Sequence, residues 1–131
     1  MYLLDTDTCI YVLNNRSKKL RHKFKVTKEL GISAITYAEL CFGIENGVQA
    51  KRKQRKEQLD LFTQLLEILP FDERAGADYA SIRSDLKKKG QMIGNNDLLI
   101  AAHARSIDAV LVSNNLKEFE RVEGLTLENW V

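Results

Sequence analysis

The sequence has few of the residues that mark unusual protein classes. It contains one proline, two cysteines and seven glycines among 131 residues, and its 20 basic and 18 acidic side chains leave a net charge of +2. This composition excludes disordered, collagen-like and low-complexity chains, and no linker rich in serine or glycine divides the chain. The length predicts one domain over residues 1–131. So small a net charge does not indicate a nucleic-acid partner, which only the distribution of charge can do.

Targeting and membrane-spanning segments are also missing. Carboxylates at Asp5 and Asp7 interrupt the apolar N-terminus, so no signal peptide fits. No apolar run approaches the roughly 20 residues that cross a bilayer. Cys9 and Cys41 are too few and too far apart for a disulfide scaffold or a four-thiolate zinc site. We therefore expect a soluble cytoplasmic protein with two reduced, buried thiols and no membrane partner.

Short apolar strands alternate with helices along the chain. The predicted strands cover residues 1–4, 31–35, 67–69, 109–112 and 125–127, and the predicted helices cover 8–14, 37–45, 51–66, 72–89, 97–105 and 115–120. In helix 51–66 and just beyond it, an apolar stripe predicts a core face made of Leu59, Phe62, Leu65, Leu66 and Leu69. The alternation predicts an α/β fold with three α/β/α layers and a mostly parallel sheet of about five strands. Sites in such folds form beyond the carboxyl ends of the strands.

Carboxylates occur at or near that edge of the predicted sheet. Asp5 and Asp7 follow the first strand, and Glu39 comes soon after the second. Asp97 lies at the head of the helix before the fourth strand, and Glu118 lies just after that strand. Taken singly, each has a structural explanation as a helix cap, a capping-box acid or a first-turn carboxylate favoured by the helix dipole. The segments 36–39 and 115–118 both match capping boxes, the second more loosely.

Convergence of the carboxylates would change this interpretation. Two carboxylates about 5 Å apart repel by about 3 kcal/mol at an effective dielectric constant of 20, whereas a helix dipole contributes about 0.3–1 kcal/mol. Such a site must take up protons or hold a cation. Ligand sets made only of oxygen select Mg²⁺ or Mn²⁺ over zinc. A carboxylate-bound Mg²⁺ suits hydrolysis of a phosphodiester, because it activates water and neutralises developing charge.

Basic residues are segregated from these acids. Seven lysines and arginines lie between positions 16 and 28 with no acid among them, and further groups occupy 51–56 and 87–89. A solvated face is the ordinary explanation of each run, but their segregation favours contacts with phosphate. The RNA-binding candidates are Arg16, Lys18, Lys19, Arg21, Lys23 and Lys25.

Four segments, in order, resemble the signatures of the PIN-domain ribonucleases, and most closely those of the VapC toxins of bacterial toxin–antitoxin pairs. They are LLDTD at 3–7, SAITYAEL at 33–40, IGNNDLLIAA at 93–102 and LVSNNLKEFERV at 111–122. The resemblance covers the whole chain and implies a PIN-like fold and a Mg²⁺-dependent endoribonuclease that cleaves structured RNA, commonly tRNA. It also implies a homodimer and a cognate antitoxin that blocks the site. By motif it assigns the metal to Asp5, Glu39 and Asp97, with Glu118 as the more variable fourth acid.

Two positions depart from the family pattern. Relatives often have Asn where this chain has Asp7, which adds a supporting or fifth acid. Many PIN domains have Asp where this chain has Asn115, so the fourth acid is either lost or transferred to Glu118. Ser113 and Asn115 would then be polar supports or phosphate contacts.

Three other functions fit parts of the pattern. A receiver-like signalling module matches the length and an acid, Asp72, after a possible strand, but the chain lacks its adjacent acid pair and its Lys-Pro. A haloacid-dehalogenase-like phosphatase matches Asp5-Thr6-Asp7, but the few residues after Ser113 leave no room for its later motifs. In a non-enzymatic RNA-binding module, the acids would be caps only.

Overall fold

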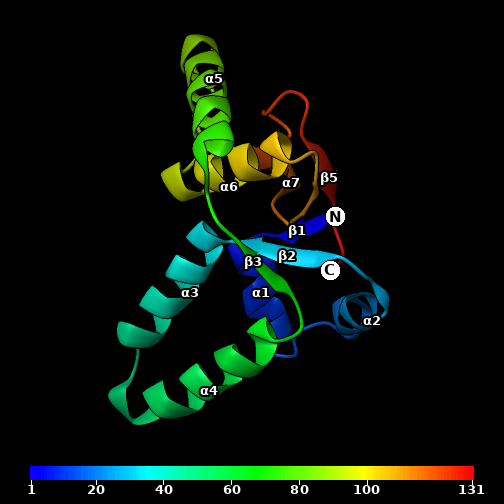
Figure 1. The fold of residues 1–131 in the computed structure, drawn as a ribbon, viewed down its shortest axis with the longest axis vertical. Helices are drawn as coiled ribbons and strands as arrows, with labels where there is room; N and C mark the ends of the chain where they lie inside the picture. Colours follow the sequence, from blue (N-terminus) through cyan, green and yellow to red (C-terminus); the bar gives the residue numbers. More distant parts are fainter.

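A five-stranded parallel sheet forms the centre of the computed structural model, which describes all residues from Met1 to Val131 (Figure 1). The strands are β1 (Tyr2–Leu4), β2 (Leu30–Ser33), β3 (Glu67–Leu69), β4 (Val110–Val112) and β5 (Thr126–Glu128), in the order β3-β2-β1-β4-β5. Every neighbouring pair is parallel, with Leu3 opposite Gly31 on one side and Leu111 on the other. All carboxyl ends therefore lie at one edge, and the strand order reverses between β1 and β4, where sites in such sheets form.

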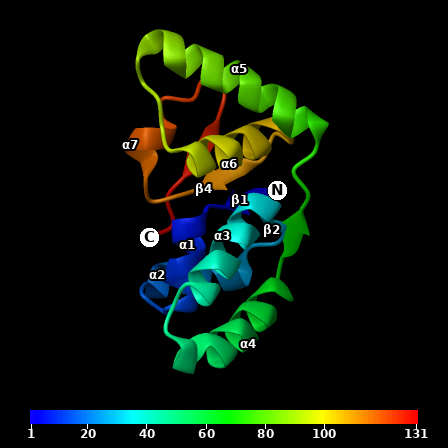
Figure 2. The same cartoon turned by 90° about the vertical axis from the view of Figure 1, so that its left-hand side faces the viewer.

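Helices cover both faces of this sheet, which gives the three layers that the sequence predicts. The helices are α1 (Thr6–Leu13), α2 (Lys18–Val26), α3 (Ala34–Glu45), α4 (Arg52–Thr63), α5 (Glu73–Lys89), α6 (Asn95–Ser106) and α7 (Leu116–Phe119), with a 3₁₀ turn, η1 (Gln49–Lys51), before α4. Helices α1 to α4 lie on one side of the sheet, and α5, α6 and α7 lie on the other (Figures 1 and 2).

Each central strand contributes to two cores. Leu3 and Leu111 are buried with residues of α5 and α6, whereas the next residues along each strand, Leu4 and Val112, are buried with residues of α1 to α4. Successive side chains of a strand point to opposite faces, so a strand covered on both sides must be apolar throughout. This explains the short apolar runs of the sequence.

Helix α2 was not among the predicted helices. Ser17 caps it, since its Oγ accepts a hydrogen bond from Leu20 N–H at 3.1 Å. Leu20 and Phe24, four residues apart, form its apolar face, and the ring of Phe24 stacks on Phe62 at 5.5 Å between centroids. The Ser17 cap and the spacing of Leu20 and Phe24 are local signals for a helix that the sequence prediction missed, and packing of these two side chains against distant residues stabilises it.

One member of the predicted apolar stripe is not in the core. Leu59 and Phe62 are buried as expected, but the Leu65 residue is 66% exposed. Helix α4 ends at Thr63, two residues before Leu65, so the helical periodicity no longer places Leu65 on the inner face. The prediction that Leu65 lies in the core was therefore wrong.

Both cysteines are free thiols, Cys9 buried and Cys41 half-buried. None of the helices combines the length and the apolar character needed to span a bilayer.

Candidate active site

Asp5 stands directly after β1 and caps α1. Its Oδ1 accepts a hydrogen bond from Thr8 N–H at 2.8 Å, and the residue is 3% exposed. Burial raises the pKa of the Asp5 carboxyl above its ordinary value, although hydrogen bonds from Ser113 and Thr8 act in the opposite direction. Ser113 is fully buried and follows β4, the strand next to β1. The cap predicted here is present, and it places a carboxylate at the point where the strand order reverses.

Glu39 lies in the second turn of α3 and is held by a residue of α1. The Thr6 hydroxyl donates a hydrogen bond to Glu39 Oε1 at 2.6 Å. The capping-box interpretation of 36–39 is wrong, because α3 begins earlier: Ser33 is its cap, with Oγ accepting from Ile35 N–H at 3.1 Å. Glu39 therefore does not cap α3, and its carboxylate can take part in the site. The sequence did not predict a role for Thr6 beside Glu39, because this contact joins segments that lie 33 residues apart.

Asp97 and Glu118 lie on different helices and are hydrogen-bonded to each other. Asp97 lies in the first turn of α6 and Glu118 lies in α7. Glu118 accepts hydrogen bonds from Gly94 N–H at 3.1 Å and from the Asn115 amide at 2.7 Å. Burial tends to raise the pKa of Glu118, but these donors, together with Asp97 and Arg121, lower it below its ordinary value. The side chain of Asn115 thus orients Glu118 and makes no capping bond of its own to α7.

The pKa of Asp97 responds to burial and to the other carboxylates. It is raised to about 7, first by burial, then by the hydrogen bond and charge of Glu118, and further by the charges of Asp5 and Glu39. Asp5, Glu39, Asp97 and Glu118, called here the acid cluster, therefore act on one another electrostatically. The structure thus places Asp97 in contact with Glu118 and within electrostatic reach of Asp5 and Glu39, the other acids that the sequence singles out.

The acid cluster offers the oxygen ligands that a hard cation prefers, but its side chains are not arranged around one common point. No three or more His, Cys, Asp or Glu side chains stand together as a set that could hold a metal ion. Asp5, Glu39 and Glu118 each accept a hydrogen bond from a different donor, and Asp97 and Glu118 contact each other. A cation shared by three of them requires these side chains to turn toward a common point. All four are oxygen ligands, which fits Mg²⁺ or Mn²⁺.

Two further acids differ in their relation to this cluster. Asp7 is exposed in the first turn of α1, and its charge helps to raise the pKa of Asp5. Asp72, the acceptor that a receiver-like module would need, lies after the edge strand β3. Its Oδ1 caps α5 by accepting from Arg74 N–H and Ala75 N–H, both at 3.1 Å. Asp72 is therefore an exposed structural cap away from the central strands.

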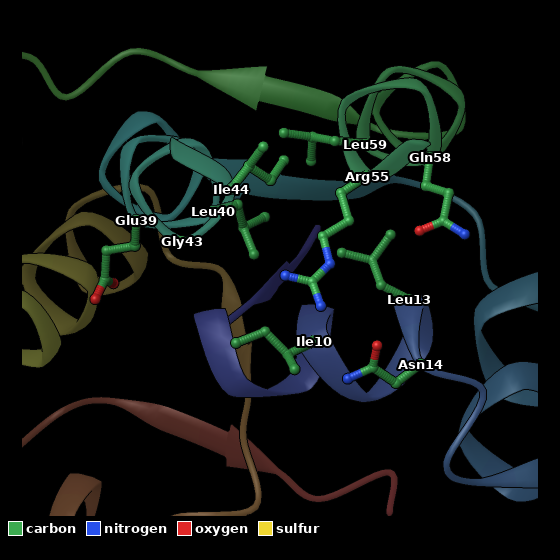
Figure 3. A pocket seen from close by; sticks show the side chains of 10 residues that line it. All are labelled: Ile10, Leu13, Asn14, Glu39, Leu40, Gly43, Ile44, Arg55, Gln58 and Leu59. Atoms are coloured by element: carbon green, nitrogen blue, oxygen red, sulfur yellow. The ribbon is translucent and has the colours of Figure 1, made fainter. Parts of the chain in front are cut away.

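A groove beside Glu39 was not predicted from the sequence. It has a volume of about 290 Å³ and lies between α1, α3 and α4 (Figure 3). Its lining residues are Ile10, Leu13, Asn14, Glu39, Leu40, Gly43, Ile44, Arg55, Gln58 and Leu59. Figure 3 shows the Arg55 guanidinium reaching from α4 toward α1, with Glu39 at the end of the groove near α6. The groove thus combines apolar walls with one cation and one acid of the cluster.

The predicted RNA-binding residues occupy α2 and the segment before it. Lys18, Lys19, Lys23 and Lys25 are exposed on α2, whereas Arg21 is half-buried. Lys19 and Lys23 line a hollow with Asn129 and Trp130, which follow β5. Arg16 lines another hollow with Asp7 and Asn114. Arg16, Lys19 and Lys23 therefore share hollows with residues at the carboxyl edge of the sheet, the edge that carries the acid cluster.

Comparisons with known proteins agree with this arrangement. The PIN domain family model matches residues 2–125. The chain is 40% identical over 133 residues to Ribonuclease VapC2 of Rickettsia felis, covering 99% of this chain and 98% of that protein. It is 38% identical over 130 residues to the tRNA(fMet)-specific endonuclease VapC of Salmonella typhimurium, covering 98% and 97% of the two chains.

Solved structures show the same relationship. A chain of DNA-bound VapBC from Salmonella typhimurium superposes with a TM-score of 0.94 at 37% identity, over 99% of this chain and 98% of that one. A chain of VapBC2 from Rickettsia felis bound to promoter DNA superposes with a TM-score of 0.91 at 39% identity, over the same shares. This protein therefore belongs to the PIN-domain family, in the branch of the VapC ribonuclease toxins of toxin–antitoxin systems.

Proposed function

We propose that the protein is a Mg²⁺-dependent endoribonuclease toxin, able to use Mn²⁺, that cleaves structured RNA and tRNA in particular. The observation that carries the proposal is the position of four carboxylates near the reversal of strand order, where burial first, and then the hydrogen bond and charge of Glu118 and the charges of Asp5 and Glu39, raise the pKa of Asp97 to about 7. Like charges gathered in this way favour either a shared proton or a shared cation. Membership of the PIN family supports the cation.

The carboxylates of Asp5, Glu39, Asp97 and Glu118 would hold the ion. When bound, Mg²⁺ supplies Lewis acidity, which activates water and neutralises charge on the phosphate that is attacked. Asp97 and Glu118 must give up the proton that they share before both can act as ligands. The Thr6 hydroxyl orients Glu39, and the Asn115 amide and Gly94 N–H orient Glu118. Ser113 supports Asp5, and the exposed Asp7 adds negative charge beside it.

The substrate is proposed to be RNA, most often tRNA. A relative from Salmonella typhimurium is named a tRNA(fMet)-specific endonuclease. The exposed cations of α2, with Arg16 before it, supply a basic surface next to the acidic edge. Electrostatic contact with RNA phosphates would hold the chain of nucleotides there, while the acid cluster takes the phosphate that is cleaved.

An antitoxin is the proposed protein partner. The similar solved structures are VapBC complexes. The groove between α1, α3 and α4 offers apolar walls next to Glu39, so a bound antitoxin segment can block the acid cluster. We also propose a homodimer in the cytoplasm. Exposed apolar side chains of α3, α4 and the segments that follow them supply surface for contacts of this kind, namely those of Phe42, Val48, Leu61, Leu65 and Ile68.

Incubation of the purified protein with total cellular RNA tests the proposal. Reactions with Mg²⁺, with Mn²⁺ and with EDTA are compared, and the new 5′ ends are mapped. We expect discrete cuts, concentrated in tRNA, that require the metal and disappear in EDTA. Cuts that persist in EDTA would exclude the metal-dependent mechanism. Binding of RNA without any cut would instead favour a non-enzymatic RNA-binding module.

A further inference from the structure

A second, polar hollow lies beside the acid cluster. It has a volume of about 250 Å³ and is lined by Asp7, Ile10, Tyr11, Arg16 and Asn114. Asn114 stands between Ser113, which contacts Asp5, and Asn115, which contacts Glu118. Ile10, 40% exposed, also lines the apolar groove and so lies between the two cavities. The polar hollow is thus a separate feature on the other side of Ile10.

The backbone directs Arg16 back onto α1. Asn15 has a φ of 52°, in the left-handed region, so the chain reverses direction after the helix. The Arg16 N–H donates to the Tyr11 carbonyl at 3.1 Å. The guanidinium then lies over the Tyr11 ring, 5.7 Å from its centroid. A tight turn therefore holds an exposed cation against an aromatic ring at the mouth of this hollow.

Arg16 has no acidic partner in the structure. Its guanidinium makes no ion pair and no hydrogen bond, whereas Arg74 pairs with Asp72 and Arg105 pairs with Asp78. A free guanidinium next to an acidic site suits an anion that must approach that site. RNA phosphates adjoining the cleaved bond are anions of this kind, and guanidinium groups bind them through several N–H donors.

We propose that this hollow is a nucleotide subsite that receives one unpaired nucleotide next to the cleaved phosphodiester. The inference rests on the endoribonuclease function proposed above and names where the substrate is held. The base packs against the stack of Tyr11 and Arg16, because unpaired bases stack on aromatic rings and on guanidinium planes. The phosphate of the same nucleotide pairs with the guanidinium. Asp7 can accept hydrogen bonds from the base edge, and Asn114 can both donate and accept them.

The subsite predicts which part of a folded RNA is cut. A base within a double helix is stacked on its neighbours and cannot enter the hollow, whereas a base in a loop or an end can be displaced into it. Cuts should therefore fall next to unpaired nucleotides. A duplex of the same sequence should bind more weakly than the single strand.

Binding of a fluorescein-labelled single-stranded RNA tests the subsite separately from cleavage. The RNA spans a cut mapped with the wild-type protein, and anisotropy is measured with Ca²⁺ over a series of KCl concentrations. Arg16→Ala should weaken binding about tenfold and reduce the log–log salt slope by about 0.7, the loss of one phosphate contact with a single strand. Tyr11→Leu should weaken binding fivefold or more without changing the slope, since stacking contributes about 1–3 kcal/mol per base. Tyr11→Phe should restore wild-type binding.

Lys28→Ala is the matched control. Lys28 is an exposed cation that immediately precedes Glu29 and β2, so it lies at the opposite edge of the sheet from the acid cluster. The affinity of the Lys28→Ala variant for the RNA should stay within about twofold of wild type, since surface cations far from a phosphate contribute little. If Arg16→Ala and Tyr11→Leu bind like Lys28→Ala while the wild-type protein cuts RNA, the subsite is wrong and the proposed function stands. If the wild-type protein cuts no RNA, the proposed function itself fails.

Discussion

The acid cluster has two halves that hold their carboxylates in different ways. Asp5 and Glu39 each accept a hydrogen bond from a separate donor, Thr8 N–H at 2.8 Å and the Thr6 hydroxyl at 2.6 Å. In the other half, Glu118 accepts hydrogen bonds from Gly94 N–H and the Asn115 amide, and Asp97 is hydrogen-bonded to Glu118.

Because Glu118 has two hydrogen-bond donors, the pKa values of Glu118 and Asp97 shift in opposite directions. The pKa of Glu118 is lowered, while that of Asp97 is raised to about 7. Two carboxylates in contact thus differ because hydrogen-bond donors favour the charged form of one of them, whereas burial and neighbouring charges favour the neutral form of the other. Each carboxylate of the first half has its own hydrogen-bond donor, whereas the second half must lose a proton before both of its carboxylates can bind an ion.

The largest effect is expected from removing a charge in the half formed by Asp5 and Glu39. Asp5→Asn should lower the cleavage rate by about 10³-fold, because a lost metal ligand costs several kcal/mol of transition-state stabilisation. Asn can still cap α1, so the fold should survive. Steady-state cleavage and circular dichroism measure the two effects.

Asp72→Asn is the control for this substitution. Asp72 also caps a helix after a strand but lies outside the acid cluster. Its rate should match that of wild type. Equal rates for Asp5→Asn and wild type, with both folded, would remove Asp5 from the site.

A smaller effect is expected from removing a donor in the same half. Thr6→Val keeps the shape of the side chain but removes the hydroxyl that orients Glu39. Cleavage should fall about 10- to 100-fold, the usual cost of losing a group that orients a metal ligand. The Mg²⁺ concentration for half-maximal rate should rise. Thr6→Ser, which keeps the hydroxyl, should restore activity; failure of this rescue would contradict an orienting role.

The smallest effect concerns stability in the half that shares a proton. The pKa of Asp97 rises from the ordinary 3.8 to about 7 on folding. Between these pH values the folded chain binds more protons than the unfolded chain, so its stability falls as the pH rises. Asp97 is half-exposed, and solvent screening limits the effect to about 1 kcal/mol, or about 4 °C in Tm for a domain of this size.

Thermal unfolding in EDTA at pH 5 and pH 7.5 measures this effect. Asp97→Asn should lose less stability over the interval than wild type does. Comparison of the two proteins cancels the contributions of other titrating groups. Parallel losses in the two proteins would show that Asp97 titrates in its ordinary range.

Patterns within short segments made much of the fold predictable. Strand 67–69 is found where it was predicted, and Asp72 and Gly90 mark the two ends of α5. The helix α2 was not predicted although Ser17 and the spacing of Leu20 and Phe24 indicate it, and its contact with Phe62 could not be predicted from the sequence. Periodicity over a few residues cannot show such contacts.

The same limit applies to the site. The order of acids after strands was enough to predict that Asp5, Glu39, Asp97 and Glu118 lie near one edge. The sequence did not show that Thr6 holds Glu39 or that Ile10 and Arg55 line one groove, because these contacts join helices far apart in sequence. Nor did it show which carboxylate keeps the shared proton, which depends on the directions of the Gly94 and Asn115 donors.

Calorimetric titration with Mn²⁺, in buffers of different ionisation enthalpy, tests most directly whether the acid cluster gathers around one cation. Ligand carboxylates must be deprotonated, so binding releases protons that the apo site holds. With the pKa of Asp97 at about 7, about one proton should leave per ion bound at about pH 6, and almost none at about pH 8.5. Binding without proton release at either pH, or no binding at all, would contradict the account.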